Sequence, residues 1–295
     1  MKRRMRVVVA IVAWGVWCVS FGHAHAADEK LPDNTLGTSM SLSGLSGLLV
    51  TESAHTLPPW SLAVSGAALF SHTSSPTSSL YELAGLVALG LPGRIELAAV
   101  VPGLRIDPSG GSSETGLGDM QVSAKWRVLH QKENVWPALA LATTVTLPTG
   151  SFSKGLGTPL GPVPSALQHY GVAVKAIVSA DVDLSPDQYA VGLYAEASYY
   201  FQDLDSNTQD KMGLYAVGAA FPLMMRSENP LSSPLQFLME INGAYKRGAN
   251  QDYATFSPSL RYVGPVTVTA GFQYSVTQNA PDVLGGVAQF EFKFH

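Results

Sequence analysis

The sequence predicts an all-β protein, a transmembrane antiparallel up-and-down β-barrel of about twelve strands. Three observations predict it. After residue 59 the chain alternates apolar and polar residues over stretches of about 10 to 14 residues, longer than an ordinary soluble strand. Charged residues make up only 14% of the chain, whereas soluble domains carry about 25%. In the last strand, Phe290, Phe292 and Phe294 alternate with polar residues, which gives one face for lipid and one for a wet lumen.

The N-terminal residues 1–26 are predicted to be a cleaved secretory signal peptide. Basic residues precede an apolar run over 7–21, and Ala24 and Ala26 fit the small-residue pattern of a cleavage site. An uncleaved anchor is the alternative, but the run is short for a spanning helix. The only cysteine, Cys18, lies in this segment, so the mature chain has no thiol chemistry. Export and a barrel together predict a location in the outer membrane of a Gram-negative cell.

Residues 27–58 precede the first expected strand and are rich in serine, glycine and leucine. They are expected to be a periplasmic lead-in. Because part of the segment alternates apolar and polar residues, a plug or an extra strand inside the barrel is the alternative. The barrel itself is expected to occupy residues 59–295.

The strands follow in order from Trp60, and the expected first strand has aromatic residues, Trp60 and Phe70, at the ends of its apolar stripe, as in the girdles of a membrane barrel. The fourth is the clearest, because Val122 and Trp126 fall on the outward face and Lys125 on the inward one. The twelve expected strands cover 60–71, 81–90, 94–104, 119–128, 138–147, 169–178, 188–201, 211–221, 235–246, 253–263, 266–277 and 283–295.

The connections divide into two classes, as they do in bacterial outer-membrane barrels. Tight turns follow the even strands, at 91–94 and 264–265, and are expected on the periplasmic side, with 224–234 as an exception. The glycine- and proline-rich stretch 148–164 is the longest connection, and it could either fold inward to constrict a pore or remain outside. Long polar connections follow the odd strands and are expected outside the cell, at 72–79, 107–118, 149–166, 203–210 and 247–252.

The inward faces carry acids and bases in similar numbers, so the predicted lumen lacks a field of one sign. Each residue could line a pore or only brace the barrel, and a barrel of this width predicts a narrow or plugged pore. Asp119, Lys125 and Arg127 are the best candidates for a constriction because they share one face of one strand. The predicted pore-lining residues are Glu82, Glu96, Asp119, Lys125, Arg127, Lys175, Glu196, Glu240, Arg261, Glu291 and Lys293.

No catalytic, cofactor-binding or metal-binding motif is recognised, so no cofactor and no enzymatic activity are predicted. His72-Thr73-Ser74 resembles the His-x-Ser arrangement of the outer-membrane phospholipase, but no acid follows until Glu82 to orient the histidine. A lipid hydrolase is therefore a remote alternative. The net charge of -4 argues against nucleic acid as a partner. A secreted β-sandwich would also alternate apolar and polar residues, but its strands would be shorter.

Two segments carry a more specific likeness. Residues 115–128 contain Gly116-Leu117-Gly118-Asp119 followed by Lys125-Trp126-Arg127, and residues 137–158 contain Leu147-Pro148-Thr149-Gly150. These motifs resemble the phenol-degradation meta-pathway family of outer-membrane transporters, and residues 54–60 are similar to the lead-in to that family's first strand. The chain departs from the pattern at His295, because such barrels usually end on the aromatic residue.

The resemblance implies a channel for small, often aromatic or hydrophobic, compounds. We therefore expect passive diffusion of a small solute through an outer-membrane barrel that contacts membrane lipid and is inserted by the barrel assembly machinery. The alternative is a structural or surface-binding barrel without transport.

Overall fold

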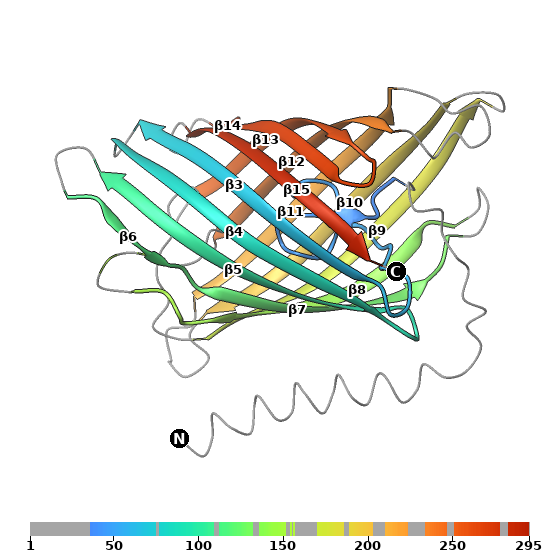
Figure 1. The fold of residues 1–295 in the computed structure, drawn as a ribbon, viewed down its shortest axis with the longest axis horizontal. Helices are drawn as coiled ribbons and strands as arrows, with labels where there is room; N and C mark the ends of the chain where they lie inside the picture. The colour runs from blue at the N-terminus through green and yellow to red at the C-terminus, as the bar shows by residue number, and fades with distance from the viewer. Residues whose placement is uncertain are drawn as a thin grey trace, which may run out of the picture.

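The computed structural model describes most of the chain after residue 35 as one closed antiparallel barrel (Figure 1). The predicted signal peptide and most of the 149–166, 203–210 and 224–234 connections lie outside the described residues. The described ranges are 36–74, 77–108, 112–131, 136–151, 154, 156, 170–185, 189–202, 210–223, 234–246, 251–277 and 283–294.

Each barrel strand pairs antiparallel with its neighbour in sequence, and the last strand pairs with the first, so the sheet has no free edge. In this last pairing Phe294 lies opposite Leu62. The strands are β3 (Leu62–Ser74), β4 (Thr77–Leu91), β5 (Ile95–Pro108), β6 (Glu114–Leu117), β7 (Met120–Leu129), β8 (Ala138–Leu147), β9 (Gly171–Ser185), β10 (Tyr189–Gln202), β11 (Asp210–Pro222), β12 (Leu235–Lys246), β13 (Gln251–Tyr262), β14 (Thr267–Ser275) and β15 (Val283–Phe294).

The described sheet has 13 strands, but β6 and β7 both pair with β5 and are separated only by Gly118 and Asp119. They are two pieces of one strand, so the barrel has twelve positions around its circumference. The prediction of a barrel of about twelve strands is confirmed. We call the rim that contains Phe294 the C-terminal rim, and the rim where β3 ends and β4 begins the loop rim.

One predicted connection is wrong. Residues 72–79 were expected to form a long loop because they are mostly serine and threonine, but β3 continues to Ser74 and β4 begins at Thr77. Cross-strand contacts explain the difference. The Thr73 hydroxyl lies 2.8 Å from that of Ser78, and the rings of Phe70 and Tyr81 are 5.1 Å apart. These pairs extend the ladder through residues whose composition alone favours a loop.

The chain also enters β3 differently from the prediction, because Trp60 is not part of the first strand. It has a φ of 63° and precedes β3, and its N–H donates to the Gly90 carbonyl at 2.7 Å. A side chain on Gly90 would collide with the Pro58 carbonyl, so glycine is needed where the chain crosses the end of β4.

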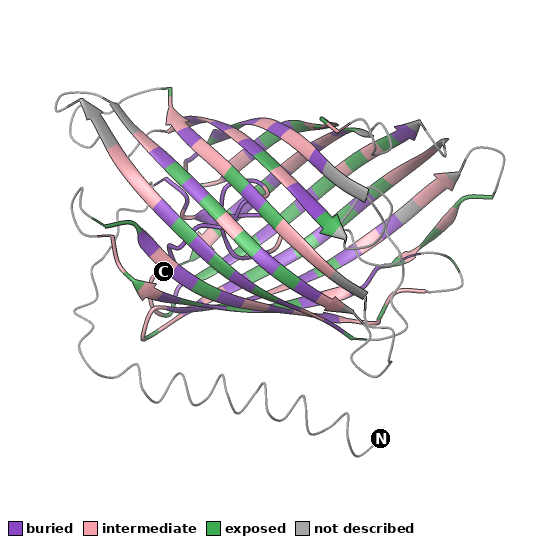
Figure 2. Cartoon of the chain, turned by 180° about the vertical axis from the view of Figure 1, so that it is seen from behind, coloured by how far each residue is buried: buried purple, intermediate pink, exposed green. Residues whose placement is uncertain are grey.

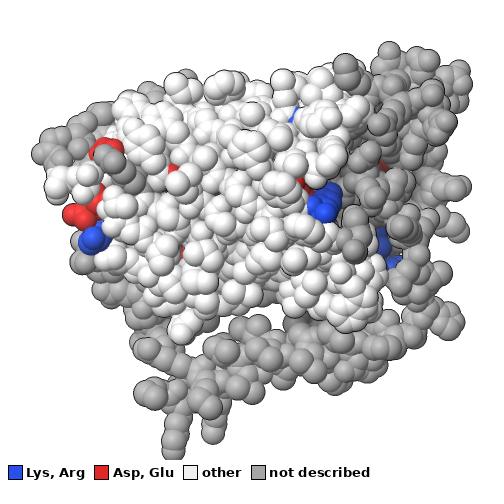
Figure 3. Space-filling model, viewed as in Figure 1, with Lys and Arg blue, Asp and Glu red and all other residues white. Residues whose placement is uncertain are grey.

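Burial alternates along the strands, which separates an outer from an inner face (Figure 2). On β7, Lys125 is 1% exposed, whereas its neighbours on the outer face, Val122 and Trp126, are 45% and 38% exposed. This confirms the predicted faces of that strand. Few charged atoms reach the visible outer wall between the two rims (Figure 3). Such an uncharged band is what the hydrocarbon core of a membrane requires of a barrel.

Among the described residues, no helix has the length and apolar character needed to span a bilayer.

Arginine in the middle of the outer wall should destabilise the barrel. Val217 is exposed and lies mid-strand on β11, opposite Ala195 and Ile241. We expect Val217→Arg to lower the free energy of unfolding in lipid by about 2 to 4 kcal/mol, because the guanidinium would lie near the bilayer midplane. Leu284→Arg, near the loop rim, should cost no more than about 1 kcal/mol. Urea unfolding in lipid vesicles measures both, and equal losses would contradict this placement of the membrane.

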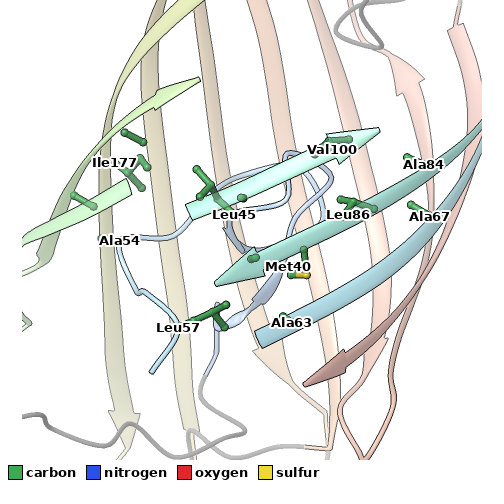
Figure 4. Packing of buried hydrophobic residues seen from close by; sticks show 14 of the residues in the cluster. Met40, Leu45, Ala54, Leu57, Ala63, Ala67, Ala84, Leu86, Val100 and Ile177 are labelled. Atoms are coloured by element: carbon green, nitrogen blue, oxygen red, sulfur yellow. The ribbon is translucent and has the colours of Figure 1, made fainter. Parts of the chain in front are cut away.

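Residues 36–59, which we call the luminal segment, lie inside the barrel (Figure 1). The segment contains a small hairpin of β1 (Ser39–Met40) and β2 (Ser46–Gly47). Its apolar side chains, among them Met40, Leu45 and Leu57, pack against small wall residues such as Ala63 and Ala84 (Figure 4). The alanines leave the space that the segment fills.

On the opposite side of the barrel, the wall residues also leave room for the luminal segment. At Gly218 of β11, an added Cβ would lie 2.6 Å from Leu48 Cδ1 of the luminal segment. Leu36 and Leu48 complete a second buried cluster with Tyr194 and Leu238. The segment therefore packs against both sides of the barrel.

Candidate functional site: the barrel interior

The predicted pore-lining residues all lie on the inner face, but most of them face the luminal segment instead of open water. Nine are buried, and Glu196 and Lys293 are partly exposed. The nine buried residues are Glu82, Glu96, Asp119, Lys125, Arg127, Lys175, Glu240, Arg261 and Glu291.

The Glu240 carboxylate, on β12, binds consecutive backbone amides of the luminal segment. It accepts hydrogen bonds from the N–H groups of Leu49 at 3.1 Å, Val50 at 2.9 Å and Thr51 at 2.6 Å. Backbone amides are neutral donors that bind a carboxylate strongly in a dry interior. One glutamate therefore fixes a turn of the segment.

Glu96, on β5, forms the most connected contact of the interior. Its carboxylate accepts hydrogen bonds from the N–H groups of Ser46 at 2.6 Å and Leu57 at 2.8 Å and from the Ser46 hydroxyl at 2.6 Å. The Lys125 ammonium lies 3.4 Å from the same carboxylate and donates to the carbonyls of Ser46 and Ser53, each at 3.1 Å. Both charged side chains are fully buried, and each supports the other.

A second ion pair joins Glu52 of the luminal segment to Lys175 of β9. Burial works against ionisation of Glu52, but the Lys175 and Lys125 ammonium groups and a hydrogen bond from Ser43 together outweigh it and lower the pKa of this carboxyl below its ordinary value. The backbone N–H of Glu52 donates to Glu196 of β10 at 2.8 Å. Sequence reasoning missed Glu52, although it is the sole Asp, Glu, Lys or Arg in residues 36–59 and therefore carried a signal.

The β1–β2 hairpin of the luminal segment is held by side chains of β13 and β15. Arg261 donates to the Gly47 carbonyl at 3.1 Å. Glu291 accepts from the Met40 N–H at 3.0 Å, and the Gln289 side-chain amide donates to the Met40 carbonyl at 3.1 Å. Strands from every part of the barrel thus contribute to one binding surface for the segment.

Asp119, Lys125 and Arg127 are expected from the sequence to act together near a constriction. In the structure, Asp119 and Lys125 bind different parts of the chain. Asp119 lies just before β7 begins, whereas Lys125 lies in the middle of that strand, and the Asp119 carboxylate accepts a hydrogen bond from the N–H of Gly150 at 2.8 Å. It thereby fixes the start of the connection to β9, whose Leu156 is fully buried. Lys125 instead binds the luminal segment, and Arg127 is buried nearer the C-terminal rim.

A cavity of about 210 Å³ occupies the interior on the loop-rim side of the luminal segment. Leu42 and Val50 of the segment close it toward the C-terminal rim, and Leu69, Leu80 and Leu214 contribute to its walls. Of the predicted pore-lining residues, only Glu82, Lys175 and Glu196 border this cavity.

The His72-Thr73-Ser74 stretch forms part of β3, and the His72 ring contacts a different serine. Its Nδ1 lies 3.1 Å from the hydroxyl of Ser79 on β4, and the histidine is exposed. Within the described part of the chain, no group of His, Cys, Asp and Glu residues could hold a metal ion.

Comparisons with known proteins place this fold. The crystal structure of an outer membrane channel from Pseudomonas putida F1 has a TM-score of 0.58 at 15% identity, over 82% of this chain and 98% of that one. The NanC porin has a TM-score of 0.49 at 13% identity, over 78% of this chain and 100% of that one. The β domain of the Bordetella autotransporter BrkA has a TM-score of 0.49 at 10% identity, over 79% of this chain and 99% of that one.

A search of curated protein sequences found no match. The model of the family described as "Putative MetA-pathway of phenol degradation" matches residues 60–288, which is all of the barrel except its last few residues. The match includes the glycine-rich and Leu-Pro-Thr-Gly motifs on which the resemblance was based. The chain is therefore a member of this phenol-degradation family, and its barrel has the fold of the Pseudomonas putida channel.

Proposed function

We propose that the protein is an outer-membrane channel through which small solutes, aromatic or hydrophobic compounds among them, diffuse passively. The observation that carries the proposal is the cavity of about 210 Å³ inside a closed barrel. Apolar and polar side chains both line it, and the leucines and aromatic rings among them suit a solute with a hydrocarbon body. The uncharged outer band supports a location in a membrane.

Family membership and the fold give further support. The family's description names phenol degradation, and the structurally similar Pseudomonas putida protein is described as an outer membrane channel. Passage requires a route past the luminal segment, which fills the interior toward the C-terminal rim. The segment therefore sets the resistance of the channel, and only narrow solutes are expected to pass.

Filling the cavity should reduce permeation. Ala216 lies on the inner face of β11 and borders the cavity, so Ala216→Trp places an indole in the solute path. We expect liposomes with this variant to admit phenol several-fold more slowly than those with the unmodified protein. Ala195→Trp, on the outer face of β10, is the matched control and should leave the rate unchanged. A wild type that admits neither phenol nor small sugars would refute the channel.

A structural or surface-binding barrel is the second candidate, and the many hydrogen bonds that hold the luminal segment favour it. Such a barrel would be impermeable with its luminal segment in place. Permeation of small solutes through the unmodified full-length protein in liposomes therefore separates the two candidates.

A further inference from the structure

The charges around the cavity are unequal. Its acidic and basic side chains are Glu52, Glu82, Lys175 and Glu196, which are three acids and one base. The base is already paired with Glu52, and Glu196 accepts the Glu52 N–H. The remaining acid, Glu82, has no such neighbour. The cavity therefore has more acidic than basic side chains.

Glu82 is buried in an apolar part of the wall. It lies on β4 opposite Leu69 of β3, with Leu80 and Ala84 beside it on the same inner face. Its side chain is 4% exposed, and no described residue forms a hydrogen bond or an ion pair with its carboxyl. A carboxylate removed from water without a partner is strongly destabilised, and a bound cation would supply that partner.

We propose that the cavity binds a small amphiphilic solute with an ammonium head group, for which the Glu82 carboxylate is the counter-ion. Leu69, Leu80 and Leu214 contact the hydrocarbon body of the solute. The proposal deepens the proposed function by naming a solute class and rests on it for delivery of the solute, whereas binding itself does not require passage.

The size of the cavity agrees with such a ligand. An engineered apolar cavity of about 150 Å³ holds benzene. The cavity here, at about 210 Å³, has room for a phenyl ring with a short aminoalkyl chain. An ammonium group that binds a buried carboxylate gains the attraction of an ion pair as well as a hydrogen bond, whereas a hydroxyl of similar size gains only the hydrogen bond.

The test compares 2-phenylethylamine, protonated at neutral pH, with 2-phenylethanol as its uncharged analogue. Calorimetry on the purified full-length protein in a nonionic detergent should show the amine binding about tenfold or more tightly than the alcohol. Glu82→Gln should abolish this preference and leave alcohol binding unchanged. Glu114→Gln is the matched control, since Glu114 lies outside the cavity and pairs with Lys154 at 3.7 Å. This variant should keep the full preference.

Equal binding of amine and alcohol by the unmodified protein would overturn the proposal, whether or not any variant folds. A preference that survives Glu82→Gln would also overturn it. Liposome swelling with the same two solutes separates this result from the proposed function. Permeation without an amine preference overturns the site and supports the channel, whereas amine-selective binding without permeation supports the site and overturns the channel.

Discussion

Replacing Glu96 with alanine is expected to lower the free energy of unfolding by about 3 to 5 kcal/mol. The variant leaves the Lys125 ammonium fully buried without its carboxylate. It also removes the acceptor of the Ser46 and Leu57 amides. An unpaired buried charge is costly because neither water nor another side chain can solvate it. Urea unfolding in lipid vesicles, followed by tryptophan fluorescence, measures the loss.

Two variants test whether the stranded lysine is the cause. The double variant Glu96→Ala, Lys125→Met should be more stable than Glu96→Ala alone, since it contains no unpaired charge. Glu114→Ala breaks an exposed pair with Lys154, and it should cost less than about 1 kcal/mol. A loss of less than about 1 kcal/mol for Glu96→Ala would contradict the assigned role of this pair.

The faces of the barrel could be predicted from sequence because they depend on a local rule. Successive residues of a strand point to opposite sides, so the alternation around Lys125 assigns the inner and outer faces without knowledge of the partner strand. The same rule places Glu82, Glu240 and Arg261 on the inner face. All three are buried in the structure.

The luminal segment could not be placed in the same way. Its position depends on contacts with residues that are far away in sequence. Met40 binds Glu291, which is 251 positions later, and Leu49 binds Glu240, which is 191 positions later. Its backbone amides carry no side-chain pattern, so nothing in the sequence marks them as the ligands of a carboxylate. The charged residues of the wall can be predicted from the sequence, but the backbone groups that they bind cannot.

The hairpin between β3 and β4 shows the same limit on a smaller scale. Serine and threonine occur in loops and in strands, and the local composition of 72–79 favoured a loop. The stretch instead belongs to β3 and β4, because the hydroxyl groups of Thr73 and Ser78 contact each other across the two strands. Local propensity predicts the central residues of a strand, whereas the positions of the strand ends depend on pairing with the neighbouring strand.

The contacts of the luminal segment assign a different role to the charged residues of the wall. In an open pore, glutamates and lysines of both signs would contact water and passing ions. Here Glu96, Glu240 and Lys125 instead bind peptide groups of the protein itself. The interior is thus a binding site for a segment of the same chain, and only the space toward the loop rim is left for a solute.

Deleting residues 36–57 should raise the single-channel conductance several-fold, because the barrel remains while the material that fills it is removed. The wall residues that now bind the segment would face water. They are four acids, Glu96, Glu196, Glu240 and Glu291, and three bases, Lys125, Lys175 and Arg261. The open pore should therefore prefer cations weakly.

Planar bilayers measure both the conductance and the reversal potential in a salt gradient. Glu240→Ala is a graded version of the deletion, since it removes only the acceptor of three amides and leaves the segment in the chain. We expect this variant to show brief openings to the larger conductance, as the segment detaches locally and binds again. If the deleted protein still folds and conducts no better than the full chain, then the luminal segment does not control passage, and the resistance must lie on the loop-rim side of the cavity.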